Sequence, residues 1–419
     1  MKVLRFIVIA LVLFTLTIIL MPGCEYDVAE PQWDITEYNP PDTIPIINSI
    51  SPQQAVPGTN IITILGENFD LVPLTNIKLE YQVGPQRPTI IPEIIGKTET
   101  SITIRRPNLV TDSCYAKVWR DSGSVVKFGP YKIDPVMEEW GSFLENQQLN
   151  ALAADNAENL YVVQGSVSPY SIVKISAAGE RSVLLDSLPV LPPAAGNAPT
   201  DAVIGPDGNL YLLRDNRQIQ KINSVSGEAT VWHRLSANER LSFGDFDANG
   251  YFYTGGPRTT DLWIIAPDSS SSAIGVYSTD SIWNVKVYGN QVYVVVGGDA
   301  GLAIWRHSII SPGIVDPIKQ LVLDFSARFG YRSIESIAVS SDGKIFIGTD
   351  APEDPVLIFD PASDNLDYFY KNILPPYCKA FSWGIGDYFY MISGNTASAT
   401  TPAQTWDCFR VDAGVNSAQ

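Results

Sequence analysis

The stretch Ala202-Val-Ile-Gly-Pro-Asp-Gly-Asn-Leu-Tyr211 joins a short apolar run, a polar turn and a second apolar run that ends on an aromatic residue. The same phrase recurs at residues 152–161, 245–253, 285–293, 337–346 and 381–390. The anchors, which are the final aromatic residues of the six copies, lie 50, 42, 40, 53 and 44 residues apart and are Tyr161, Tyr211, Tyr253, Tyr293, Phe346 and Tyr390. A phrase that returns at such a period marks a repeated structural unit.

A period of about 40 to 50 residues is typical of a four-stranded propeller blade. We therefore predict a six-bladed β-propeller over residues 137–419. Two further strand-like runs follow each phrase, except in the last copy, where only a third strand, at 406–411, is evident. We expect residues 138–144 to supply the missing strand, because ring closure removes exposed strand edges.

Two of the turns carry a resemblance to known propellers. The segments Pro206-Asp-Gly-Asn-Leu-Tyr211 and Ser341-Asp-Gly-Lys-Ile-Phe346 resemble turns of the NHL and SMP-30-like propeller superfamily. The resemblance implies a propeller fold, and a fold does not by itself determine a function.

Residues 43–133 predict a separate β-sandwich, since short strand-like runs with turn residues between them span about 90 positions. The elements Ile50-Ser-Pro52, Pro57-Gly-Thr59 and Thr63-Ile-Leu-Gly-Glu-Asn-Phe69 resemble the IPT/TIG family of Ig-like domains. This resemblance implies a spacer or interaction module in which the Gly-x-Asn-Phe element forms a structural corner, and it implies no catalysis.

The N-terminus reads as an export signal. Lys2 and Arg5 precede an apolar run at 6–20, which is short for a membrane span, and residues 1–23 end on Gly23 before Cys24. This end resembles the lipobox of bacterial lipoproteins, which implies that Cys24 is acylated. The alternative is an uncleaved single-span anchor.

Several expectations follow from a lipidated Cys24. Residues 24–42, which are acidic and contain prolines, then form a flexible tether. Glu25 stands where the family's inner-membrane retention signal has an aspartate. We therefore expect a membrane partner through the lipid anchor and a cell-envelope location, at the outer membrane or cell surface.

Composition supports an all-β, acidic protein. Hydrophobic residues make up 45% of the chain and charged residues 17%, and 31 glycines and 30 prolines indicate many turns. The formal net charge of −17 disfavours binding to nucleic acid, whose phosphates it repels.

Ligand sites of propellers lie at the mouth of the central channel. Alignment of the repeats places a polar or aromatic set where the innermost strands begin: Asn150, Asp201, Phe243, Trp283, Asn284, Glu335 and Lys379. Asn150, Asp201, Asn284 and Glu335 carry oxygen donors of the kind that Ca²⁺ binds, and Asp201 and Glu335 are the candidate metal ligands. They are similar to the metal set of SMP-30-like lactonases, although their order and spacing differ and Lys379 adds a cation.

Other motifs point to structure. Asp245-x-Asp247-x-Asn249-Gly250 is similar to the start of an EF-hand loop, but position twelve is Gly256, so we interpret the phrase as a turn. The two histidines, His233 and His307, form no HExxH motif, and no GxSxG is present. We expect the three cysteines that remain after lipidation to be buried thiols: Cys114, Cys378 and Cys408.

Two functions remain open. The first is a non-enzymatic surface lipoprotein whose propeller binds a glycan, a peptide or a protein partner. The alternative is a metal-dependent hydrolase, a lactonase or glycan-cleaving enzyme, that uses the channel mouth. Convergence of Asn150, Asp201 and Glu335 would favour the hydrolase, whereas a mouth capped by Phe243 and Trp283 would favour binding.

Overall fold

The computed structural model describes residues 44–120, 125–144, 147–190, 197–236, 239–277, 280–299, 301–330, 332–394 and 406–417. The predictions for the signal segment 1–23, for Cys24 and for the tether 24–42 lie outside these residues. Residues 45–419 form one compact unit. None of the helices in the described ranges is long and apolar enough to span a membrane.

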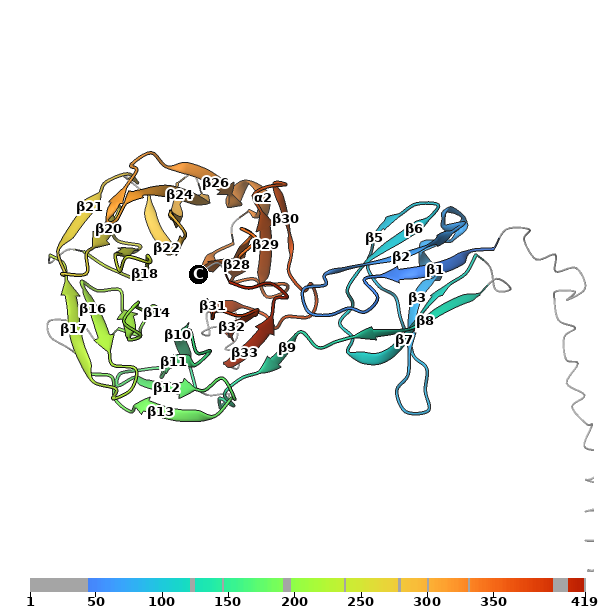
Figure 1. The fold of residues 1–419 in the computed structure, drawn as a ribbon, viewed down its shortest axis with the longest axis horizontal. Helices are drawn as coiled ribbons and strands as arrows, with labels where there is room; N and C mark the ends of the chain where they lie inside the picture. Colours follow the sequence, from blue (N-terminus) through green and yellow to red (C-terminus); the bar gives the residue numbers. More distant parts are fainter. Residues whose placement is uncertain are drawn as a thin grey trace, which may run out of the picture. The chain divides into compact units, whose positions relative to one another are not determined.

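The N-terminal module is a sandwich of two antiparallel four-stranded sheets (Figure 1). One sheet has the order β1 (Ile46–Ser51), β2 (Ile61–Glu67), β6 (Ser101–Arg105), β5 (Ile94–Lys97). The other has the order β4 (Thr89–Ile90), β3 (Ile77–Tyr81), β7 (Thr111–Val118), β8 (Val126–Ile133). Alternate residues of β2 and β6 are buried in the shared core. The predicted Ig-like sandwich is confirmed.

The Gly66-x-Asn68-Phe69 element forms the expected corner after β2. A Cβ atom on Gly66 would lie 1.8 Å from the carbonyl oxygen of Ile46, so only glycine fits there. Asn68 adopts a left-handed conformation with φ of 61°, and Phe69 is fully buried. Two short 3-10 helices follow, η2 (Phe69–Leu71) and η3 (Leu74–Asn76).

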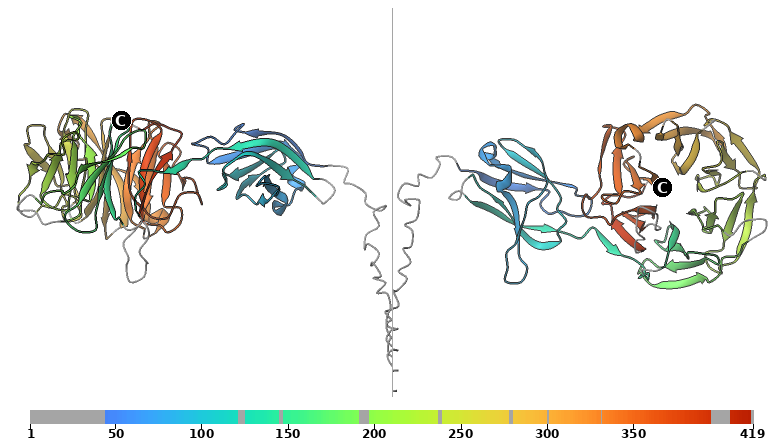
Figure 2. Two further views of the ribbon diagram at one scale, coloured as in Figure 1. Left: turned by 90° about the horizontal axis from the view of Figure 1, so that it is seen from below. Right: turned by 180° about the vertical axis from the view of Figure 1, so that it is seen from behind.

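In the described part of the chain, six further antiparallel sheets surround a common axis, as a propeller requires (Figures 1 and 2). From the innermost strand outward, blade 1 contains β10 (Leu149–Ala154), β11 (Leu160–Gln164), β12 (Ser171–Ile175) and β13 (Arg181–Leu185). Blade 2 contains β14 (Asp201–Ile204), β15 (Leu210–Leu213), β16 (Gln218–Ile222) and β17 (Ala229–Arg234). Blade 3 contains β18 (Phe243–Phe246), β19 (Phe252–Gly255), β20 (Leu262–Ile265) and β21 (Ser271–Ile274). The predicted all-β six-bladed propeller is confirmed.

Blades 4 to 6 follow the same plan, with one addition. Blade 4 contains β22 (Ser281–Tyr288), β23 (Gln291–Gly298), the long β24 (Gly301–Ser311), β26 (Gln320–Asp324) and an extra short strand, β25 (Ile314–Val315), before the helix α2 (Phe325–Phe329). Blade 5 contains β27 (Ile334–Val339), β28 (Ile345–Thr349), β29 (Val356–Asp360) and β30 (Asn365–Tyr368). Blade 6 contains β31 (Cys378–Trp383), β32 (Tyr388–Ser393) and β33 (Asp407–Asp412).

The ring closes with a strand from the start of the propeller sequence. β9 (Met137–Glu139) pairs antiparallel with β33, and Arg410 Nε donates a 2.9 Å hydrogen bond to Glu138 Oε1. Closure by this region was predicted, but the strand is shorter than the expected 138–144 and starts one residue earlier. It ends before Trp140, whose ring lies 3.8 Å from the Arg410 guanidinium.

The aromatic anchors explain the recurring phrase. The hydroxyls of Tyr161, Tyr211 and Tyr253 donate to an aspartate at the preceding turn of the same blade, at 3.0 to 3.2 Å. These aspartates, Asp155, Asp207 and Asp247, also accept backbone N–H groups of their turns. Each of these three anchors therefore fixes the turn between the first two strands of its blade while its ring is buried in a blade core.

The sandwich contacts blades 5 and 6 within the compact unit. Arg105 forms two 3.1 Å hydrogen bonds to the carboxylate of Asp367. The buried Tyr370 hydroxyl accepts from Gly58 N at 2.6 Å and donates to Asp412 O at 2.7 Å. These partly buried bonds join the sandwich to the propeller.

Candidate functional site

The ladder register places equivalent residues of the six innermost strands on one face of each strand. The anchor-facing set lies directly opposite the aromatic anchors and comprises Ala153, Val203, Asp245, Lys286, Ala338 and Ser382. The second set lies two residues earlier along the same strands and comprises Ala151, Asp201, Phe243, Asn284, Ser336 and Ala380. Only a few members of either set are polar, and these determine the chemistry of the channel.

Polar members of both sets bond to the innermost strand of the next blade. Asp201 Oδ2 accepts from Gly244 N at 3.1 Å, and Asp245 Oδ2 accepts from Val287 N at 2.9 Å. Ser382 Oγ accepts from Ala154 N at 3.0 Å, which links blade 6 to blade 1. Because an innermost strand is a sheet edge, these bonds satisfy backbone groups that its own blade leaves unpaired.

Most of the predicted mouth residues lie at the end of the channel where the innermost strands begin. In β10, β22, β27 and β31 the register shifts there by one residue, and the extra residues of the four β-bulges are Asn150, Trp283, Glu335 and Lys379. We call this the bulge end. β-bulges re-aim side chains and are common beside functional sites.

At the bulge end the charged side chains have partners. Glu335 Oε2 lies 3.8 Å from Lys379 Nζ, and Ser333 Oγ donates a 2.6 Å hydrogen bond to Glu335 Oε1. Asn284 Nδ2 donates to the carbonyl of Glu335 at 3.4 Å. The structure thus brings together Asn284, Glu335 and Lys379.

Two further residues of the bulge end do not join this group. Asn150 is buried and bonds within its own blade, to Gln148 Nε2 at 3.1 Å and to Gly165 O at 2.8 Å. Trp283 remains 42% exposed and covers Gly297, where a Cβ would lie 2.7 Å from the indole Nε1.

Asp201 belongs to a different group, together with Asp245 and Lys286. Burial raises the pKa of both aspartates, and the Lys286 ammonium partly offsets this rise. Burial acts to lower the pKa of Lys286, but the two carboxylates outweigh it and raise that pKa. Lys286 therefore stays protonated, and each of the three side chains keeps part of its surface open to the channel.

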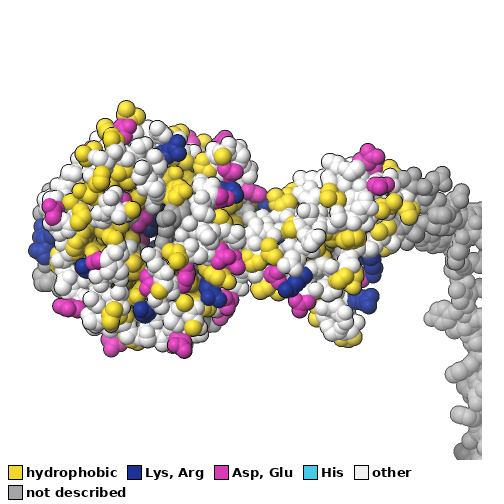
Figure 3. Space-filling model, viewed as in Figure 1, with side chains coloured by type: hydrophobic (Ala, Val, Ile, Leu, Met, Phe, Trp, Pro, Cys, Tyr) yellow, Lys and Arg dark blue, Asp and Glu magenta, His cyan; other side chains and the backbone are white. Residues whose placement is uncertain are grey.

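The opposite end of the channel, where the innermost strands end, contains a cavity of about 490 Å³. Its walls come from all six blades and are mainly apolar or aromatic, with contributions from Val203, Ile204, Pro206, Phe246, Tyr288, Ile337, Phe381 and Trp383. The propeller face in Figure 3 is hollowed at the centre of the ring. A volume of this size is in the range of small-molecule sites.

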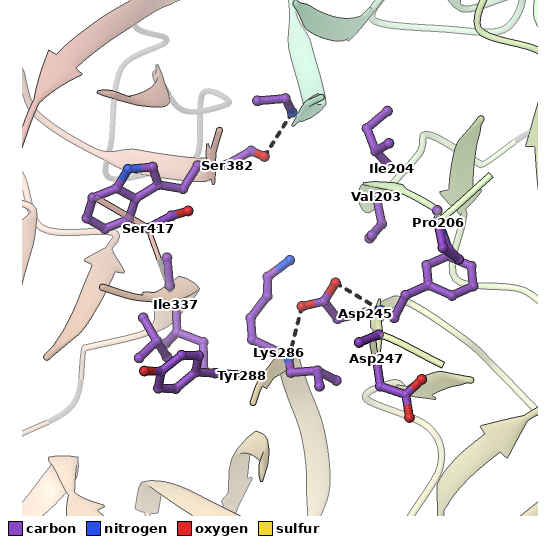
Figure 4. A pocket seen from close by; sticks show the side chains of 18 of the residues that line it. Val203, Ile204, Pro206, Asp245, Asp247, Lys286, Tyr288, Ile337, Ser382 and Ser417 are labelled. Atoms are coloured by element: carbon purple, nitrogen blue, oxygen red, sulfur yellow. Dashed lines mark hydrogen bonds between the residues drawn. The ribbon is translucent and has the colours of Figure 1, made fainter. Parts of the chain in front are cut away.

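Few polar side chains line this cavity end. Figure 4 shows the Lys286 side chain directed into the cavity beside Asp245, with Ser382 and Ser417 across from it. Both oxygens of Asp245 accept backbone N–H groups, from Phe246 and Val287. Lys286 Nζ, by contrast, forms no hydrogen bond or ion pair within 4 Å with any residue that the structure describes.

The other candidates from the sequence have structural roles. Asp247 accepts from Asn249 N, Tyr251 N and the Tyr253 hydroxyl, which confirms the turn. His307 is buried between the Tyr277 hydroxyl and the Asp316 carbonyl. Burial lowers the pKa of both histidines and raises the pKa of the three cysteines, which are free and buried as predicted.

Sequence reasoning missed Asp245 as a channel residue and missed Lys286 entirely. Asp245 was absorbed into the turn motif, and Lys286 stands in an apolar run, Val285-Lys-Val-Tyr288, that reads as ordinary alternation. A usable signal was present, since both residues occupy the position opposite the anchor, where the other blades have Ala, Val or Ser.

Comparisons with known proteins agree with this architecture. Residues 45–132 match the family model described as IPT/TIG domain. A structural genomics protein of unknown function from Bacteroides thetaiotaomicron is similar over 89% of this chain and 98% of its own, with 10% identity and a TM-score of 0.50. A luciferin-regenerating enzyme is similar over 68% of this chain and 97% of its own, with 13% identity and a TM-score of 0.51.

A putative gluconolactonase gives a TM-score of 0.49 at 12% identity, over 68% of this chain and 94% of its own. At these identities the similarities concern the fold alone. The chain thus carries an IPT/TIG domain at residues 45–132, followed by a β-propeller, and it is similar in fold to the Bacteroides protein and to the luciferin-regenerating enzyme.

Proposed function

We propose that this protein is a ligand-binding protein of the cell envelope, held to a membrane by a lipid on Cys24, whose propeller binds a small molecule at the cavity end of its channel. The observation that carries the proposal is the Lys286 ammonium. It is directed into a largely apolar cavity of about 490 Å³ without a hydrogen-bond partner among the described residues. Binding sites commonly combine apolar walls with a few convergent polar groups.

An enzymatic function finds less support in this geometry. The raised pKa of Lys286 keeps it an ammonium, whereas a nucleophilic lysine needs a lowered pKa. Both oxygens of Asp201 and both oxygens of Asp245 accept backbone N–H groups, whereas glycoside hydrolysis needs a carboxylic acid that is free to protonate the leaving group.

The donor set of a metal-dependent hydrolase is also not assembled in the described ranges. They contain no group of three His, Cys, Asp or Glu side chains placed to hold a metal ion. Glu335 is engaged by Lys379 and Ser333, while Asp201 accepts backbone N–H groups of blades 2 and 3. We therefore favour binding.

A thermal-shift screen tests the binding site. The protein used is the chain from Glu25 onward, which retains the whole compact unit 45–419. The probes are monosaccharides, disaccharides, sugar acids, amino acids, short peptides and nucleosides. We expect a compound that raises the Tm of the wild type and of Lys379→Met, a matched change at the bulge end, but not of Lys286→Met. Equal shifts in both variants, or no shift with any compound, would contradict the cavity as the binding site.

Membrane attachment has its own test. Expressed in a bacterium, the wild-type chain should incorporate radiolabelled palmitate and sediment with membranes, whereas Cys24→Ala should do neither. Cys114→Ala, which changes a buried thiol of the sandwich, is the control. Palmitate incorporation that survives in Cys24→Ala would refute the lipid anchor.

A further inference from the structure

The lining of the cavity includes several hydrogen-bond donors and one cation, Lys286. Lys286 offers N–H donors without a partner, and the buried Ser417 Oγ also has no partner among the described residues. Ser382 Oγ accepts from Ala154 N, which leaves its own hydrogen to donate. The lining carboxylates of Asp245 and Asp247 already accept two or more N–H or O–H groups each. An occupant with acceptor oxygens would therefore satisfy the Lys286 ammonium and the Ser382 hydroxyl.

The charge around Lys286 restricts the occupant further. Asp201 and Asp245 both interact electrostatically with the Lys286 ammonium, so a single positive charge faces two carboxyl groups. A third acidic group beside Lys286, on the ligand, would meet like charge in a partly buried site, where repulsion is strong. The whole chain, with a formal net charge of −17, adds to this repulsion.

The walls indicate the shape of the occupant. Phe246, Tyr288, Phe381 and Trp383 contribute aromatic surface, and aliphatic side chains of blades 2 and 5 fill the space between. A ring with C–H faces and peripheral oxygens satisfies both the walls and the donors. A neutral sugar has these properties, since each hydroxyl accepts a hydrogen bond and carries no charge.

We propose that the cavity binds an uncharged saccharide ring, that Lys286 donates to one of its oxygens, and that Asp201 and Asp245 make the site discriminate against sugar acids. This assignment rests on the proposed binding function and adds the ligand class and the residues that determine specificity. Asp245 and Lys286 line the cavity itself, whereas Asp201 is not part of the lining and acts through its electrostatic interaction with Lys286.

The test compares neutral sugars with their acids, glucose with glucuronate and galactose with galacturonate, and the disaccharides of each, by isothermal titration of the chain from Glu25 onward. We expect the neutral member of a pair to bind at least ~10-fold more tightly, as one repelled charge implies. Asp201→Asn/Asp245→Asn should remove this preference or reverse it, because Lys286 then lacks compensation. The control Asp268→Asn/Asp299→Asn changes net charge equally at exposed sites and should keep the preference.

Each outcome separates the two proposals. Equal or tighter binding of the acids by the wild type would overturn the assignment and leave small-molecule binding intact. Lys286-dependent binding of another compound class, with no sugar bound, would do the same. An Asp201→Asn/Asp245→Asn variant that binds neutral sugars yet still rejects the acids would refute the role of the carboxylates. Absence of binding by every class would overturn both proposals, provided that circular dichroism shows each protein to be folded.

Discussion

The two ends of the propeller channel differ in how their charges are satisfied. At the bulge end, Glu335 faces Lys379 and a serine hydroxyl, so the charged groups there already have partners. At the cavity end, the Lys286 ammonium lies near two carboxyl groups that backbone amides hold in place, and it forms no direct bond with the described residues. A charged residue near a channel is thus a poor sign of a site, whereas an unsatisfied donor over a cavity is a better one.

The largest expected effect on stability comes from Lys286→Met. Without the ammonium, the pKa values of Asp201 and Asp245 rise further, and their ionisation destabilises the fold as pH increases above the ordinary aspartate value of 3.8. We expect a loss of about 2 kcal/mol at pH 7, which is below the cost for fully buried pairs because these groups are partly exposed. The loss should shrink toward ~pH 4, where both carboxyls are protonated.

Urea unfolding at several pH values measures this effect. Lys379→Met, which removes a half-exposed partner at 3.8 Å, should change stability by less than ~0.5 kcal/mol at any of these pH values. A loss of stability in Lys286→Met that does not vary with pH would show that the Lys286 ammonium does not compensate the charges of Asp201 and Asp245.

A smaller effect is expected from Asp245→Ala. This change removes the acceptor of Val287 N and Phe246 N and should cost about 1–2 kcal/mol, since backbone N–H groups at the blade 3 to blade 4 junction lose their partner. The counterpart at the bulge end, Glu335→Ala, should cost less than ~1 kcal/mol. Hydrogen exchange of the Val287 amide provides a local readout, and unchanged protection there would count against the cross-blade bond.

The smallest expected effect is an increase in stability, in the variant Ala153→Ser. Blade 1 has alanine at both channel positions, Ala151 and Ala153, so among the described residues neither position provides a side-chain hydrogen bond to blade 2. Ser382, at the position equivalent to Ala153, accepts from the residue after Ala153, and by the same register a serine at 153 would accept from Ile204 N. Ala153→Ser should therefore stabilise the protein by about 0.5 kcal/mol.

Thermal unfolding measures that gain, with Ala153→Cys as a control of similar size and weaker acceptor strength. A lower Tm in Ala153→Ser than in Ala153→Cys would show that the junction between blades 1 and 2 does not follow the pattern of the others.

The sequence determined the architecture well, because it rests on local and periodic signals. The aromatic anchors predicted six blades, and the Gly66-x-Asn68-Phe69 element predicted the corner of the sandwich. The extra strand β25 in blade 4 was not foreseen, since the residues around Ile314–Val315 carry no repeat signal. The closing strand β9 was located to the right region but not to the right length.

The candidate site was only partly accessible from the sequence. Alignment by strand starts found the bulge residues, because polar side chains are conspicuous there. Whether the charged groups of Glu335 and Lys286 have hydrogen-bond or ion-pair partners depends on contacts between residues far apart in the chain. Glu335 and Lys379, which form such a pair, are separated by 44 positions in the sequence. The register opposite the anchors would have revealed Asp245 and Lys286, but it becomes visible only when the repeats are aligned strand by strand.

The most direct measurement is a crystal structure of the chain from Glu25 onward with the compound that raises its Tm most. We predict that the compound lies at the cavity end, with an oxygen atom within hydrogen-bond distance of Lys286 Nζ and its ring against the aromatic wall that includes Tyr288. A compound found instead at the bulge end, beside Trp283 and Lys379, would contradict the account.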